Sequence, residues 1–277
     1  MISGKTHLIA HLGYPTEAFK APLIYNPWFE QNGIDAVVVP MGVPAADYPG
    51  VLAALARLTN LRGALVTMPH KVTTLGLVAE ASPAAQIAGA CNALLKRADG
   101  RWIGDQFDGT GFVRGVERKG RSIAGIGALV SGAGGVGSAI AASLAAAGAR
   151  ELMLFDQQPA AATALRDRLL QHYPLLAVGT GSNDPAGFDL VVNATPLGMR
   201  ADDPLPFDVA RISPSTFVGE VVMAREITPL LAAARVRGCP IQQGTDMLFE
   251  MIPAYLEFFG FPTATPDELR AVAQIRY

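Results

Sequence analysis

The chain has 277 residues, of which 50% are hydrophobic and 17% are charged, and its formal net charge is −2. This length suggests two domains of ordinary size, and a near-neutral chain without clustered Lys and Arg argues against nucleic acid as a partner. The apolar runs are too short for a signal peptide or a membrane helix, so we expect a cytoplasmic protein with two reduced core cysteines, Cys91 and Cys239.

The first part of the chain alternates short apolar runs with helical patterns. Strands are predicted over residues 6–12, 36–40, 63–68 and 91–97. The segments 22–33 and 45–60 have helical spacing and end at Gly or Asn, which are common helix stop signals.

The alternation becomes clearer from about residue 126. Strands are predicted at 127–134, 151–156, 188–195 and 217–222, with helices at 135–148, 159–174 and 228–238. This βαβ pattern predicts a parallel sheet covered by helices on both faces. The segment 246–261 is too rich in aromatics and methionine for a solvated helix, so we expect it to pack on the first domain or on a second subunit.

Gly132, Gly134 and Gly137 have the G-x-G-x-x-G spacing between a predicted strand and a predicted helix. The first glycine permits a tight turn, the second lets the backbone approach a pyrophosphate, and the third allows close helix–strand packing. The amides that open the helix, at Gly135 and Val136, would face the phosphates. These residues predict a dinucleotide site.

Asp156 lies about 20 residues after the glycines, where a carboxylate binds the ribose 2′-hydroxyl of NAD. The 2′-phosphate of NADP would be repelled by this carboxylate, and the residues that follow include no nearby Arg or Lys to compensate. The sequence therefore favours NAD over NADP. The alternative is that Asp156 only caps the next helix. Asn193, Ala194 and Thr195 follow another strand, and we expect them to line the nicotinamide-ribose side.

Lys71 follows a strand and stands near the start of a helix. A solvated surface lysine is the alternative, but a cation near a helix N-terminus suggests a compensating partner. Asn92 and Asp108 come at the ends of neighbouring strand-like segments. A Lys–Asp pair can exchange a proton with a substrate hydroxyl while a dinucleotide takes the hydride.

Seven motifs together resemble the shikimate dehydrogenase family. They are "VTMPHK", "AGACNALL", "GDQFDGTGF", "GAGGVG", "VVNATPLGM", "TPLL" and "GTDML". The resemblance implies a two-domain α/β protein, with a discontinuous substrate-binding domain at 1–105 plus 242–277 and a Rossmann domain at 106–241. It implies that Lys71 and Asp108 form the catalytic pair for reversible oxidation of a ring hydroxyl, as in shikimate or quinate, in aromatic amino acid biosynthesis. It also implies that Asn92 holds the substrate, and it makes Gly244 a plausible cofactor contact.

The sequence departs from the family pattern where the substrate is expected. Family members carry S-x-S-P-x-x-H-N in the first loop, and its serines bind the substrate carboxylate. This sequence has Phe19 and Ala21 in place of the two serines and Tyr25 in place of the histidine. The predicted substrate-binding residues are Phe19, Ala21, Leu65, Thr67, Asn92, Phe107, Met223 and Met251. Losing hydrogen-bond donors to a charged group costs roughly 1.5–3 kcal/mol each, unless Lys20, Tyr25 or Gln106 compensates for the loss. We therefore expect a shikimate dehydrogenase-like NAD enzyme whose preferred substrate is not shikimate.

Other readings remain open at this point. One is a dehydrogenase for another cyclic alcohol or an amino-sugar-like acid, and another is a non-catalytic dinucleotide sensor or regulatory protein. A methylenetetrahydrofolate dehydrogenase fits the C-terminal motifs poorly. We expect a small-molecule substrate, a monomer or homodimer and no metal site, because no Cys or carboxylate is spaced around the histidines. His70 is expected to start a helix, and Asp246 and Glu250 to lie on one solvated helical face.

Overall fold

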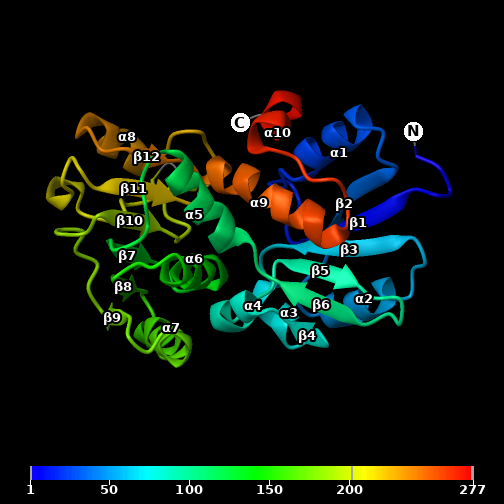
Figure 1. Ribbon diagram of the computed structural model, residues 1–277, viewed down its shortest axis with the longest axis horizontal. Helices are drawn as coiled ribbons and strands as arrows, with labels where there is room; N and C mark the ends of the chain where they lie inside the picture. The colour runs from blue at the N-terminus through cyan, green and yellow to red at the C-terminus, as the bar shows by residue number, and fades with distance from the viewer. Residues whose placement is uncertain (1, 201, 276–277) are drawn as a thin grey trace. The chain divides into compact units, whose positions relative to one another are not determined.

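The computed structural model describes residues 2–200 and 202–275 as two compact α/β units (Figure 1). The first unit runs to residue 107 and also includes the chain from residue 251, and the second unit covers residues 108–250. Each unit contains its own six-stranded sheet. The predicted two-domain α/β class is confirmed. None of the described helices is long and apolar enough to cross a membrane.

The sheet of the first unit is mixed, with strand order β2-β1-β3-β5-β6-β4. Its strands are β1 (His7–Gly13), β2 (Ala36–Gly42), β3 (Leu61–Val66), β4 (Glu80–Ala81), β5 (Ala93–Lys96) and β6 (Trp102–Asp105). β5 runs antiparallel to both of its neighbours. The sheet of this unit is not purely parallel, because a tight turn at Gly100, with φ of 82°, joins β5 and β6 as a hairpin.

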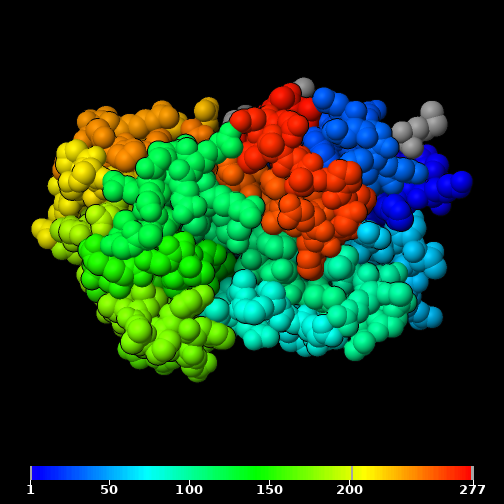
Figure 2. Space-filling model, viewed as in Figure 1, coloured from blue at the N-terminus to red at the C-terminus, as the bar shows by residue number. Residues whose placement is uncertain are grey.

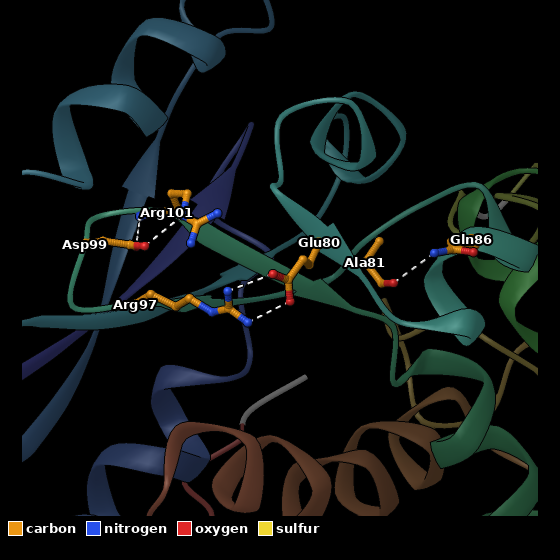
Figure 3. A network of polar contacts seen from close by, with 6 residues as sticks. All are labelled: Glu80, Ala81, Gln86, Arg97, Asp99 and Arg101. Carbon is orange, nitrogen blue, oxygen red and sulfur yellow. Dashed lines mark hydrogen bonds and ion pairs between the residues drawn. The ribbon is translucent and has the colours of Figure 1, made fainter.

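Figure 3 shows the polar contacts that hold this hairpin and the edge strand. The Arg97 guanidinium donates to both Glu80 oxygens at 2.7 and 2.6 Å, which joins the end of β5 to β4. In the turn itself, Arg101 Nε donates to Asp99 at 2.7 Å. Hydrogen bonds from Arg101 hold the pKa of Asp99 below its usual value. These are exposed contacts of the fold.

Helices cover both faces of the first sheet. Figure 1 shows α1 (Pro22–Gln31) and α10 (Pro266–Val272) on one side and α2 (Tyr48–Leu55) on the other. Tyr48 and Leu52 of α2 pack on Leu12 and Val66 of the strands. Two shorter helices, α3 (Lys71–Leu75) and α4 (Pro83–Ala88), complete the N-terminal part.

The C-terminal segment packs on the N-terminal helix of the same unit. Figure 2 shows the red C-terminal segment against the blue α1. The Gln274 amide donates to the Leu23 carbonyl at 2.9 Å, and the Phe29 and Phe261 rings lie 5.2 Å apart. Of the two placements expected for the tail, the structure shows packing on the first unit.

The sheet of the second unit is entirely parallel, with strand order β12-β11-β10-β7-β8-β9. Its strands are β7 (Gly127–Ser131), β8 (Glu151–Phe155), β9 (Ala177–Thr180), β10 (Leu190–Asn193), β11 (Phe217–Glu220) and β12 (Ile241–Gln242). The chain moves outward one way through β8 and β9 and the other way through β11 and β12. The direction reverses between β7 and β10, which is where open parallel sheets bind ligands.

The second unit buries its sheet under helices on both faces. Its helices are α5 (Asp108–Arg118), α6 (Gly135–Ala146), α7 (Pro159–His172), α8 (Pro229–Val236), the 3₁₀ helix η1 (Val209–Arg211) and the start of α9 (Gly244–Phe259). α8 packs on the face that carries Val191 and Val218. α5 lies on the opposite face, because a Cβ at Gly219 would be 2.6 Å from the Phe112 ring.

The acidic face of α9 is not solvated, so that expectation is wrong. Glu250 is only 6% exposed, and its carboxylate lies 3.6 Å from Arg118. Asp246 pairs with Lys119 at 2.7 Å. The cations come from the end of α5, more than a hundred residues away in the chain. Both cysteines are buried and free, as expected.

Candidate active site

The carboxyl edge of the first sheet gathers most of the predicted substrate residues. β1, β3 and β6 end at this edge, and β5 begins there because it is antiparallel. Strand register aligns His11 with Leu65, and Leu65 with Ala93. Thr67 and Phe107 follow β3 and β6, and Asn92 directly precedes β5, so all three are brought to one edge.

Lys71 is the first residue of α3, and its backbone ties it to Asn92. The Lys71 carbonyl accepts a hydrogen bond from the Cys91 amide at 2.9 Å, one residue before Asn92. His70 is the N-cap residue of α3, as expected for a helix-start residue. The His70 Nε2 atom is 2.8 Å from the Val43 carbonyl, and the ring stacks on Tyr48 at 4.0 Å. His70 therefore anchors the helix that carries Lys71.

Asn92 is buried and only partly satisfied by the protein. The Oδ1 atom accepts from the Phe107 amide at 2.9 Å, and the Asn92 carbonyl accepts from the Val66 amide at 2.7 Å and from Tyr255 Oη at 3.0 Å. The Nδ2 group has no hydrogen-bond partner among the described residues. A buried unsatisfied donor costs about 1–3 kcal/mol, so this amide is set to donate to a ligand.

Aromatic rings pack against one another at this edge. The half-buried Phe107 ring meets the Tyr255 ring edge to face at 4.9 Å and the Phe258 ring at 5.6 Å. Phe19 stacks on His11 with centroids 4.0 Å apart and an interplanar angle of 26°.

The loop after β1 lies close to the end of β3. A Cβ at Gly13 would be 2.4 Å from Thr67 Cγ2 and 2.8 Å from Phe19 Cζ, so these two side chains meet over the glycine. Ala21 and Leu65 are buried, at 6% and 4% exposure. Met251 is half-buried in α9, and Met223 is half-buried in the loop after β11 of the second unit.

Asp108 opens α5 in the second unit and is 2% exposed. An acid in the first turn of a helix is favourable, because the unpaired amides there carry partial positive charge. The next residue must be glycine, since a Cβ at Gly109 would be 2.0 Å from the Ala139 carbonyl oxygen. Close crossing of α5 and α6 thus determines where Asp108 is held.

The glycine loop between β7 and α6 fits a dinucleotide phosphate. Gly132 has φ of 103°, and a Cβ at Gly137 would be 1.8 Å from the Gly132 carbonyl oxygen. The fold itself therefore requires glycine at both positions. Gly134 is different, because a Cβ there would meet no atom within 4 Å. It is the N-cap residue of α6, whose first amides, at Gly135 and Val136, are available to an anion.

Asp156 follows β8 and links two backbone segments. The Oδ2 atom accepts from the Ala133 amide and Oδ1 accepts from the Gln158 amide, each at 2.8 Å. The N-cap residue of α7 is Gln158, so Asp156 binds the backbone just before the helix and does not cap it. The half-buried carboxylate still has lone pairs for a ribose hydroxyl.

The loop after β10 is organised by its own side chains. Asn193 Oδ1 accepts from the Thr195 amide at 3.1 Å and from Thr195 Oγ1 at 2.6 Å, and Nδ2 donates to the Leu197 carbonyl at 2.9 Å. Ala194 borders the glycine loop, because a Cβ at Gly132 would be 2.7 Å from the Ala194 carbonyl oxygen. Gly244, at the start of α9, approaches the loop after β11 closely, since a Cβ there would be 2.3 Å from the Val222 carbonyl oxygen.

Sequence reasoning overlooked two buried titratable residues. Glu220 pairs in register with Asn193, is fully buried, and accepts a hydrogen bond from Thr228 Oγ1 at 3.0 Å. Burial raises the pKa of Glu220 to about 7. Its signal was an acid in the otherwise apolar run "FVGEVV". His11 lies within the strand predicted over residues 6–12, and its surroundings depend on Phe19 and Lys71, which lie elsewhere in the sequence.

Comparisons with known proteins agree along the whole chain. Residues 12–94 match the family described as "Shikimate dehydrogenase substrate binding domain". A "Shikimate dehydrogenase (NADP(+))" from Acidiphilium cryptum is 38% identical over 276 residues, which are 99% of this chain and 98% of that protein.

Two solved structures show the same similarity. Shikimate 5-dehydrogenase from Listeria monocytogenes, in complex with shikimate and NAD, is 26% identical with a TM-score of 0.89, covering 98% of this chain and 97% of that one. Quinate dehydrogenase from Corynebacterium glutamicum, in complex with NAD, is 29% identical with a TM-score of 0.86, covering 96% and 98%.

Proposed function

The chain belongs to the shikimate dehydrogenase family of NAD(P)-dependent oxidoreductases acting on CH–OH groups, and on this premise we propose that Lys71 and Asp108 are its catalytic residues. The non-catalytic alternative is set aside. The first unit would bind the substrate and the second the dinucleotide, with the predicted domain limits of 1–105 plus 242–277 and 106–241. A cytoplasmic location accords with the two free, buried thiols.

One observation carries the catalytic proposal. Lys71 opens a helix held at the carboxyl edge of the sheet, and its carbonyl is bonded to the segment that presents the buried Asn92 amide. A ring hydroxyl bound here would contact the Asn92 donor and the Lys71 ammonium. Lys71, together with Asp108, would take the hydroxyl proton during oxidation and return it during reduction. A bound nicotinamide dinucleotide would supply or accept the hydride.

We propose NAD as the preferred cofactor. The half-buried Asp156 carboxylate follows β8, and the three residues after it, Gln157, Gln158 and Pro159, are uncharged. A 2′-phosphate would face this carboxylate without a compensating Arg. The glycine loop, with Gly134 open toward a ligand, would hold the pyrophosphate, and the Asn193–Thr195 loop and Gly244 would border the nicotinamide side.

We propose that the preferred substrate is less polar than shikimate. Phe19 and Ala21 offer no hydrogen-bond donors from their side chains, and the Phe19 ring lies over Gly13 beside Thr67. Phe107 presents a second ring at the same edge. A carboxylate placed against these rings would lose its hydration without gaining donors, which costs several kcal/mol.

Steady-state turnover of shikimate, quinate and carboxylate-free ring alcohols, each with NAD and with NADP, tests these assignments. We expect NAD to be favoured and shikimate to be a poor substrate. Efficient oxidation of shikimate with NADP would refute both the cofactor and the substrate proposals.

The catalytic role of Lys71 is tested separately. Lys71→Ala should lower kcat by about 10²–10⁴-fold, because a positioned acid–base group contributes that much. Binding of NAD, measured by fluorescence titration, should not change. Lys5→Ala, at an exposed position before β1, is the matched control. Wild-type kcat in Lys71→Ala would refute the catalytic role.

A further inference from the structure

We propose that His11 is a substrate-binding residue that sets specificity, with its imidazole offering Nδ1 to a hydroxyl group of the molecule bound beside Lys71 and Asn92. This inference rests on the proposed function, in which Lys71 and Asn92 lie at the substrate. It adds a group that distinguishes a hydroxyl from a carboxylate at this position.

The position of His11 in β1 determines which face it occupies. Its neighbours Ala10 and Leu12 belong to the core shared with α2. Side chains alternate along a strand, so His11 projects to the other face of the sheet. Phe19 lies over that face, stacked on the His11 ring, and its tip reaches Gly13, two residues further along β1. His11 therefore lies with Phe19 and Thr67 at the carboxyl edge.

A second buried histidine of the same unit shows what is unusual about His11. His70 is 1% exposed, stacks on Tyr48, and its Nε2 atom is bonded to the Val43 carbonyl. His11 is 7% exposed and stacks on Phe19, but its buried Nδ1 atom has no hydrogen-bond partner among the described residues. A histidine kept only for packing would be satisfied like His70, whereas Nδ1 of His11 is left for a ligand.

The charge state of His11 indicates the kind of group that it binds. Burial, and to a lesser extent the positive charge of Lys71, lower the pKa of His11 to about 3. The ring is therefore neutral at physiological pH and offers either a donor or an acceptor, but no charge. A hydroxyl group matches such a partner, while a carboxylate would need charged or multiple donors to replace its hydration. Together with the Asn92 Nδ2 donor, His11 favours an uncharged ring alcohol.

Two substitutions of His11 separate hydrogen bonding from packing. His11→Asn places an amide near the position of Nδ1, whereas His11→Leu fills a similar volume without a polar atom. Both lose the stacking on Phe19, so the stacking contact is matched between them. His7→Leu, at the exposed start of the same strand, is the control for changes in β1.

The readout is the KM and kcat of each variant on the best substrate among shikimate, quinate and carboxylate-free cyclohexane polyols. His11→Leu should raise KM about tenfold or more, because a buried substrate hydroxyl loses its partner. The value of kcat should change less, and the Kd for NAD should not change. His11→Asn should restore KM to within about threefold of the wild type. An unchanged KM in His11→Leu, or no rescue by His11→Asn, would overturn the proposal.

A second measurement keeps this inference separate from the proposed function. If the wild type oxidises no member of the panel, the proposed function fails. The His11 proposal is then decided by NMR of ¹⁵N-histidine-labelled protein titrated with the same compounds. A shift of the imidazole signal that is absent from His11→Asn supports binding at Nδ1. No shift with any compound overturns it.

Discussion

The carboxyl edges of the two sheets differ in how each would hold a ligand. At the edge of the first unit, buried side-chain atoms of His11 and Asn92 have no hydrogen-bond partner among the described residues. At the edge of the second unit, Asn193 and Thr195 hydrogen-bond within their own loop, and glycine backbone geometry shapes the cradle. The second edge is held by backbone and local contacts, whereas the first edge leaves side-chain atoms for a ligand.

The largest expected effect concerns the pH dependence of stability in the first unit. The pKa of His11 is lowered from 6.5 to about 3, so the unfolded chain binds more protons than the folded one between these values. The stabilisation is present above pH 6.5 and is lost as the pH falls through 3, by up to about 5 kcal/mol. The free energy of unfolding, measured with urea between pH 7 and 3, should fall less steeply with decreasing pH in His11→Leu than in the wild type. Parallel curves would contradict the buried neutral imidazole.

The second unit should respond to pH with the opposite sign. Burial raises the pKa of Glu220 from 4.5 to about 7, so the folded chain binds more protons between these values. The stabilisation is present below pH 4.5 and is lost as the pH rises through 7, by about 3 kcal/mol. Glu220→Gln, which stays neutral, should remove this loss in urea unfolding from pH 4.5 to 8. If the free energy of unfolding of Glu220→Gln still falls as the pH rises, a different titrating group causes the loss.

The glycine cradle provides a matched pair of substitutions. Gly137→Ala should destabilise the protein by about 2–3 kcal/mol, because its Cβ would lie 1.8 Å from the Gly132 carbonyl oxygen. Gly134→Ala meets no protein atom within 4 Å, so thermal unfolding should change little. Its methyl group should instead weaken NAD binding, measured by fluorescence titration. Equal thermal shifts for the two variants would contradict the difference between the two glycines.

The smallest expected effect lies away from both edges. Arg97→Ala removes the bidentate pair with Glu80 at the hairpin edge. Exposed ion pairs contribute about 0–1 kcal/mol, so the free energy of unfolding should fall by no more than that, and less in high salt. Turnover should be unchanged. A larger loss in urea unfolding would mean that β4 depends on this contact.

Much of the architecture follows from local patterns. The strands 6–12, 36–40 and 151–156 coincide closely with β1, β2 and β8, because apolar runs bounded by turn residues depend on nearby sequence. β4 and β9 were not predicted. β4 has only two residues, and β9 lies at the edge of its sheet with none of its four residues buried, so its sequence lacks the apolar run of a buried strand. The reversal of β5 was also missed, since it depends on which strand β5 pairs with.

The sequence by itself determined the two-domain α/β class, the glycine cradle with Asp156, and Lys71, Asn92 and Asp108 as candidates, because these rest on spacing along the chain. The tertiary structure alone decided that Glu250 is buried beside Arg118, that Glu220 has a raised pKa, and that His11 lies neutral against Phe19 near Lys71. The physical reason is common to all three. Burial and charge depend on partners that are distant in sequence, and folding brings those partners together.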